Sequence, residues 1–210
     1  MKGKMMLVAA GFVLLAASAW AQEKPRLGFK DIYLGTPKEA LRSIWEEECR
    51  REIDKGSSLR ATDYTSRPFR NRSKEEQLTL CLAEPTLTLW TGQYTRVGSV
   101  SLLSVTVHVK DEKVGGIRLG LSGRDFTAME AALTEKYGPP LLRTTEVVKN
   151  KLGAAFNSEV LTWELKDGTI LMKERSGSLN ISEVFITSDA FLNATEKERK
   201  SRAKKDAEGL

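Results

Sequence analysis

Residues 103–140 read LSVTVHVKDEKVGGIRLGLSGRDFTAMEAALTEKYGPP, and this stretch decides the fold. In its first part apolar and polar residues alternate, which predicts a strand at about 97–110 with one apolar and one polar face. The turn Asp111-Glu112-Lys113 then leads into a return strand at about 114–121. The stretch therefore opens with an antiparallel hairpin that has one face to bury.

A helix is predicted directly after this hairpin. Ser122 and Asp125 have the spacing of a capping box, in which two side chains satisfy backbone N–H groups at a helix start. Apolar residues then recur at spacings of three and four between 126 and 133, which indicates one helical face. Tyr137-Gly138-Pro139-Pro140 ends the helix, because glycine closes helices and proline cannot continue them. A hairpin followed by a helix with one apolar face indicates an α+β fold.

The chain before this stretch contains an earlier helix and further strand candidates. Thr36-Pro37-Lys38-Glu39 is another capping-box pattern, and apolar residues at helical spacing predict a helix from about 37 to 53. Residues 56–75 lack periodicity and hold Gly, Ser, Asn and Pro, which is typical of a long loop. Alternating apolar residues predict strands at about 77–83 and 86–91.

The chain after this stretch predicts an antiparallel meander and a charged tail. Strand candidates lie at about 160–166, 169–175 and 182–188, and Asp167-Gly168 joins the first two in a tight hairpin. From 193 to 210 the chain is highly charged and poor in large apolar residues. This composition predicts a frayed helix or a disordered tail.

The two halves of the chain share an order of motifs. Residues 32–35 and 117–120 both have the form Ile-x-Leu-Gly, and each precedes a capping box and a helix. We therefore predict an α+β domain over 22–192 with helices packed on sheet. It would consist of two similar units, each a helix followed by an antiparallel meander, at 29–110 and 111–192. A chance match is the alternative, because only a few residues are shared.

Residues 1–21 have the composition of a secretory signal peptide. Lys2 and Lys4 form a basic region, residues 5–18 are apolar, and Ala19-Trp20-Ala21 places small residues before a cleavage site. An uncleaved membrane anchor is the alternative, but residues 5–18 are fewer than the ~20 that span a bilayer. We expect cleavage after Ala21, no transmembrane segment in the mature chain, and a periplasmic or secreted protein.

Cys49 and Cys81 are the two cysteines of the chain. In an exported protein an even pair favours a disulfide, which here would join the end of the predicted first helix to the strand at 77–83. Two buried thiols are the alternative. The chain has only one histidine as well, so it has too few of these residues for a metal site that needs several His or Cys ligands. We expect no metal and no cofactor.

The distribution of charge argues against a nucleic-acid partner. The chain has 33 basic and 28 acidic residues, a net charge of +5. Loss of Lys2 and Lys4 with the leader lowers the net charge to +3. The tail, 193–210, holds six basic and four acidic residues, which leaves a net charge of +1 on 22–192. A nucleic-acid-binding protein concentrates basic charge on its folded face, and this body has little to concentrate.

The hairpin of Val105–Pro140 and its helix end Tyr137-Gly138-Pro139-Pro140 resemble a pattern that is common in periplasmic proteins. A strand ending in Ile-x-Leu-Gly, followed by a helix and a meander, also resembles the helix–sheet unit of two groups of small bacterial envelope proteins. One is the small outer-membrane-assembly lipoprotein family. The other is the β-lactamase-inhibitor-protein fold, built from a tandem pair of such units. With Leu161-Thr162-Trp163 the resemblance covers most of 29–188. It implies a protein that binds other macromolecules through a sheet face. The lipoproteins carry a lipid-bearing Cys after the leader, which this chain lacks, so no anchor is implied.

The sequence assigns no catalytic residue. His108 lies on the polar side of its strand with Ser104 and Thr106, and no Gly-x-Ser-x-Gly nucleophile motif accompanies it. The glycines between 115 and 123 do not form the dinucleotide-binding fingerprint. A carboxylate pair for hydrolysis needs only two acids at the right separation. A hydrolase acting on envelope material through such a pair is therefore the alternative function.

The loop 56–75 is the predicted binding segment. It interleaves cations with aromatic residues, and Arg and aromatic side chains are enriched at binding hot spots. We expect an exported, non-enzymatic binding or inhibitor-like protein of the bacterial cell envelope, whose partner is an envelope protein or an anionic envelope polymer. An ordinary solvated loop is the alternative. The predicted binding residues are Arg60, Tyr64, Arg67, Phe69, Arg70, Arg72 and Lys74.

Overall fold

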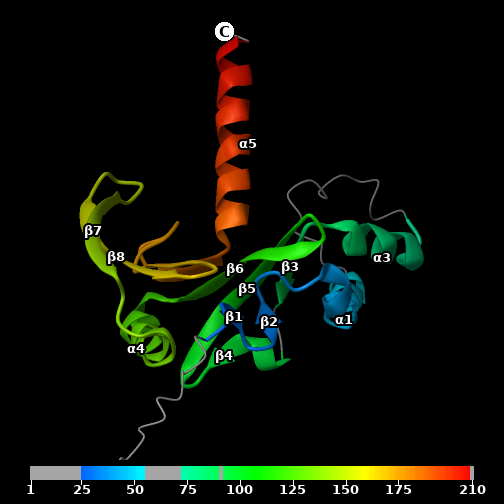
Figure 1. The fold of residues 1–210 in the computed structure, drawn as a ribbon, viewed down its shortest axis with the longest axis horizontal. Helices are drawn as coiled ribbons and strands as arrows, with labels where there is room; N and C mark the ends of the chain where they lie inside the picture. Colours follow the sequence, from blue (N-terminus) through cyan, green and yellow to red (C-terminus); the bar gives the residue numbers. More distant parts are fainter. Residues whose placement is uncertain (1–24, 55–71, 90–91, 209–210) are drawn as a thin grey trace, which may run out of the picture.

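The computed structural model describes residues 25–54, 72–89 and 92–208, so the predicted leader lies outside the described residues. An eight-stranded sheet runs in the order β3-β5-β6-β10-β9-β8-β7, with β4 paired to β5, and β1 and β2 form a separate ribbon (Figure 1). All strand pairs are antiparallel. The strands are β1 (Gly28–Phe29), β2 (Ile32–Tyr33), β3 (Thr86–Leu89), β4 (Arg96–Val97), β5 (Val100–Lys110), β6 (Lys113–Ser122), β7 (Leu142–Lys149), β8 (Ala155–Leu165), β9 (Gly168–Lys173) and β10 (Ile181–Thr187).

The predicted central hairpin is confirmed as β5 and β6. Its turn places Asp111 and Glu112 between the paired residues Lys110 and Lys113. Both turn residues have positive φ, 50° and 57°, as the two-residue turn that matches strand twist requires. The strand predicted at 97–110 is divided, because β4 and β5 form a tight hairpin of their own at its start.

The α+β class is confirmed, with helices packed on the sheet in one hydrophobic core. Trp45 from α1 and Met129 from α4 are each 1% exposed and lie in this core with Leu119 of β6 and Ile170 of β9. The helical elements are η1 (Lys38–Leu41), α1 (Arg42–Asp54), α3 (Lys74–Ala83), η2 (Gly92–Thr95), η3 (Gly123–Asp125), α4 (Phe126–Tyr137) and α5 (Asp189–Glu208).

Neither predicted capping box forms its side-chain bond. Both helices begin with a 3-10 turn, and neither turn has a side-chain cap. Thr36 instead accepts a backbone hydrogen bond from Val114 at 2.9 Å, which ties the helix entry to β6. Ser122 closes the pairing of β6 with β10, and its hydroxyl accepts from Arg124 Nε at 3.2 Å. Residues that the local pattern assigns to helix caps therefore bond to the sheet instead.

The predicted strand at 77–83 is wrong, since these residues belong to helix α3. Ser73 is its N-cap, and Glu76 completes a capping box in which each residue bonds the other's backbone N–H. Leu78, Cys81 and Leu82 also fit a helical spacing and pack toward the core. A short apolar run fits both the helical and the strand spacing, so the capping box decides between helix and strand. Residues 74 and 75 of the predicted loop 56–75 therefore belong to α3, whereas 56–71 lie outside the described residues.

Strand β7 is absent from the sequence prediction, and β8 begins earlier than the predicted strand at 160–166. β7 is largely exposed, so it shows no clear apolar alternation. The order of elements also differs between the halves: helix α3 follows α1, whereas strand β7 follows α4. The predicted pair of similar units is therefore not confirmed.

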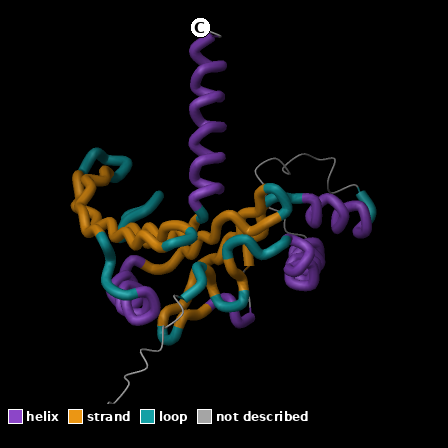
Figure 2. The backbone as a smooth tube through the Cα atoms, viewed as in Figure 1, coloured by secondary structure: helices purple, strands orange, loops and turns teal. Residues whose placement is uncertain are grey.

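The tail predicted as a frayed helix or disordered is part of helix α5, which continues to Glu208. Figure 1 shows α5 rising from the sheet near β6, on the side opposite α4. In Figure 2 it stands clear of the strands along most of its length. The sheet thus has a helix-covered face and a second face from which α5 projects, called the open face below.

Candidate binding surface

Most of the predicted binding loop lies outside the described residues. This applies to Arg60, Tyr64, Arg67, Phe69 and Arg70. Of the remaining two, Arg72 is exposed and its carbonyl accepts from Gln77 Nε2 at 3.0 Å. Lys74 begins α3 and its ammonium lies 2.6 Å from the Asp54 carboxylate. The two described residues therefore help to fix the start of α3, and Lys74 ties it to the end of α1.

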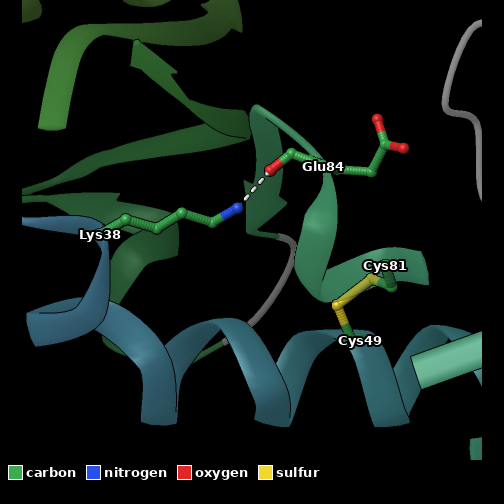
Figure 3. Close-up of a disulfide and its surroundings, with 4 residues drawn as sticks. All are labelled: Lys38, Cys49, Cys81 and Glu84. Atoms are coloured by element: carbon green, nitrogen blue, oxygen red, sulfur yellow. Dashed lines mark hydrogen bonds between the residues drawn. A yellow bond between two sulfur atoms is a disulfide. The ribbon is translucent and has the colours of Figure 1, made fainter. Parts of the chain in front are cut away.

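The expected disulfide between Cys49 and Cys81 is confirmed, although it joins two helices and not a helix and a strand. It links α1 to α3 with a Cα–Cα distance of 6.0 Å (Figure 3). Beside it, Lys38 donates from Nζ to the Glu84 carbonyl at 2.8 Å and lies over the Trp45 ring at 4.9 Å from its centre. This cluster holds α1 and α3 together and ties the start of the first helix to the end of α3.

Among the residues that the structure describes, the carboxyl groups with shifted pKa values are partners of lysine. The Lys74 ammonium lowers the pKa of Asp54 by hydrogen bonding and by its charge. In the same way Lys200 lowers the pKa of Glu196, and Lys110 lowers that of Glu198. A general acid in a hydrolase needs a raised pKa, so these three carboxyls are suited to ion pairs and not to that role.

The open face carries a row of side chains that crosses five strands. Strand pairing sets Thr106 of β5 beside Arg118, Arg118 beside Phe185, Phe185 beside Leu171, and Leu171 beside Thr162 of β8. Phe185 and Leu171 are half-buried although they point away from the main core. The centre of the open face is therefore apolar and its flanks are polar.

Ion pairs lie next to this apolar centre. Arg118 and Glu183 approach to 3.6 Å, and Lys173 and Glu146 to 3.0 Å. Glu183 also accepts a short hydrogen bond from the Ser176 hydroxyl. The cations of these two pairs are thus already matched by acids on the same face.

The base of α5 is fixed to the open face by an aromatic side chain. Phe191 lies against Gly115 and Gly116, where a Cβ at Gly115 would approach the ring to 2.3 Å. Its ring also lies 6.0 Å from that of His108. Burial lowers the pKa of His108, and the positive charge of Arg118 lowers it further. Phe191 therefore packs against a neutral histidine and against glycine backbone that carries no side chain.

The opposite end of the face is formed by the β7–β8 hairpin, which turns toward the same side as α5 (Figure 1). Arg143 holds this hairpin to α4, because it pairs with Glu130 of α4 and with Glu159 of β8. The open face thus lies between a projecting helix and a raised hairpin, which gives it two walls.

Other kinds of site find little support in the described part of the chain. No three His, Cys, Asp or Glu side chains there are grouped so that they could hold a metal ion. No described helix combines the length and apolar character needed to cross a membrane. A hollow of about 360 Å³ contains Arg124 and Arg175, but each bonds a neighbouring side chain.

Comparisons with protein-family models, with curated proteins and with solved structures find no match to this chain. The resemblance to the assembly lipoproteins and to the inhibitor-protein fold therefore stays a prediction.

Proposed function

We propose that the chain is an exported, non-enzymatic binding or inhibitor-like protein of the bacterial cell envelope, which takes a partner protein on the open face. The observation that carries this proposal is the apolar centre of that face, Phe185 and Leu171, flanked by ion pairs between two walls. An apolar centre with a polar rim is the usual organisation of a protein–protein interface.

The paired charges favour a protein over an anionic polymer as the partner. An anionic polymer would have to compete with Glu183 for Arg118 and with Glu146 for Lys173. A protein surface carries both signs of charge and can match such alternating pairs. The disulfide is compatible with an extracellular location, because disulfides persist in oxidising compartments. Export is also what the predicted leader implies.

The test compares face variants with a matched control. Leu171→Glu and Phe185→Glu place a charge in the apolar centre, whereas Leu103→Glu makes the same kind of change at a residue that is 52% exposed in β5. The tagged mature chain is used to capture partners from a bacterial envelope extract. We expect both face variants to reduce retention of the partner at least tenfold, and the control to retain it as wild type does.

Two readouts make this test decisive. Circular dichroism establishes that each variant is folded, and protease treatment of the captured material separates a protein from a polymer. Equal retention by wild type and both face variants would show that the open face is not the binding surface. Captured material that resists protease and is released by salt would identify an anionic polymer instead.

A further inference from the structure

Strand β7 forms one edge of the sheet, with β8 on its inner side. Large exposed apolar side chains are concentrated at this edge. Of the seven in the described residues, five lie between 141 and 156, and Val147 and Leu152 are 64% and 93% exposed. An exposed strand edge with apolar side chains is a template for pairing with another strand. The five are Leu141, Leu142, Val147, Leu152 and Phe156.

Hydrogen bonds in β8 show which backbone groups of β7 point outward. Glu174 donates its N–H to the Glu159 carbonyl at 2.9 Å, and the Glu159 N–H donates to the Glu174 carboxylate at 3.1 Å. Both backbone groups of Glu159 therefore point away from β7, and its partner Thr145 is a non-hydrogen-bonded position. Because these positions alternate, the N–H and C=O groups of Arg143, Thr145 and Val147 point away from β8, toward the free edge.

We propose that β7 pairs in antiparallel orientation with β7 of a second copy of this chain, about a twofold axis at Thr145. Thr145 is then opposite itself, and Arg143 of each copy is opposite Val147 of the other. All three pairs use the outward backbone groups, and each exchanges two hydrogen bonds, about six in all. The contact is isologous and closes as a dimer.

Side chains on the open face fit this register. Non-hydrogen-bonded partners approach more closely than hydrogen-bonded ones, and here Leu142 is opposite Val148 of the second copy on both sides of the axis. Thr144 is opposite Glu146, which pairs a hydroxyl with a carboxylate. The strand is therefore complementary to itself in its outward backbone groups and in apolar contact, and no like charges are directly opposed. This self-complementarity identifies a second copy as the partner.

The neighbouring registers are less favourable. Opposite residues must share a face, so a twofold axis has to pass through a residue, and the nearest alternatives are Thr144 and Glu146. An axis at Glu146 sets that carboxylate opposite itself and Arg143 opposite Lys149, and like charges in direct opposition repel. An axis at Thr144 brings Leu141 opposite Val147, but it sets Leu142 opposite the Glu146 carboxylate and loses the Leu142–Val148 pair at the closely spaced position.

Cysteine cross-linking reads the register directly. Opposed residues of a hydrogen-bonded pair have Cα atoms ~5.5 Å apart, within the range that a disulfide spans. Thr145→Cys should therefore give a covalent dimer of the full mature chain on mild oxidation. Thr144→Cys and Glu146→Cys are the matched controls and should stay monomeric on a denaturing gel. A covalent dimer from either control, or none from Thr145→Cys, would overturn the proposal.

Sedimentation gives a second measurement without added thiols. The wild-type chain should be dimeric at ~100 µM, whereas Thr145→Pro should weaken dimerisation at least tenfold. Proline removes an N–H that points to the free edge and leaves the bonds to β8 intact. Val147→Lys blocks the edge by charge, and Thr86→Lys makes a similar change at the opposite edge strand, β3, as control. A monomeric wild type, or a dimer that resists both β7 variants, would overturn the second copy as the partner.

Discussion

Opening the Cys49–Cys81 disulfide should lower the free energy of unfolding by about 3–4 kcal/mol. The two cysteines are 32 residues apart in sequence. A cross-link over a loop of that length removes about 12 cal/mol/K of entropy from the unfolded chain, which gives this figure at 25 °C. Both residues are buried in the core, at 0% and 5% exposure.

The assay is urea unfolding of the oxidised and the reduced chain, followed by tryptophan fluorescence. With a slope of about 2 kcal/mol/M, the midpoint should fall by about 1.5–2 M on reduction. The double variant Cys49→Ala, Cys81→Ala should match the reduced chain to within about 1 kcal/mol, since it removes the same cross-link. A loss below about 1 kcal/mol would show that the unfolded chain already holds the two cysteines close, and would refute the entropic reasoning.

The remaining predictions concern the core and the base of α5. Trp163→Ala should cost about 3–5 kcal/mol of unfolding free energy, measured by denaturant titration, because the side chain is 2% exposed and its indole N–H bonds a backbone carbonyl at 2.8 Å. Gly115→Val should displace Phe191 and speed tryptic cleavage within α5, whereas a cleavage rate equal to wild type would contradict the contact. Burial and Arg118 hold the pKa of His108 below its ordinary 6.5, so stability is full above that pH and should fall as the pH decreases below it. Unfolding at pH 7 and pH 5 measures this fall, which should be smaller in His108→Gln.

The parts of the fold that the sequence predicts are those where local signals agree with tertiary contacts. The β5–β6 hairpin alternates cleanly because one face is buried along its whole length. Helix α4 is also predictable, since its apolar stripe reaches the core and Gly138 ends it with a φ of 85°. In both cases the residues that set the local pattern are the same residues that pack.

The errors arise where burial is partial. In α3 the run of leucines fits a strand as well as a helix, and only the capping box of Ser73 and Glu76 separates the two. In β7 both faces are largely exposed, so no alternation marks it, and pairing with β8 alone defines the strand. At the start of the first helix the error is the opposite one. Thr36 fits the pattern of a helix cap, but its carbonyl accepts a hydrogen bond from β6 instead.

The candidate binding face could not be read from the sequence, because it is assembled from pairings between distant segments. Arg118 and Phe185 become neighbours only when β10 inserts between β6 and β9. His108 illustrates the limit: its polar strand face was predicted, but its contact with Phe191 depends on where α5 leaves the sheet. Residue types identify a face, whereas strand order decides which residues share it.

Helix α5 shows how a charged segment can be helical and still weakly held. Its composition offers no apolar face, so packing contributes little beyond Phe191 at its base. Ion pairs support the helix instead: Glu196 lies near both Arg199 and Lys200, and Glu198 pairs with Lys110 of β5. Exposed pairs of this kind contribute only about 0–1 kcal/mol each. The wall that α5 forms beside the open face is held to the sheet only at Phe191 and by the exposed Lys110–Glu198 pair in the described residues, so it should move at low cost. The opposite wall is paired with β8 along the whole of β7 and is held to α4 through Arg143. On the proposed function, a partner would meet one fixed wall and one adjustable wall, and the low-stability element is the one expected to reorganise on binding.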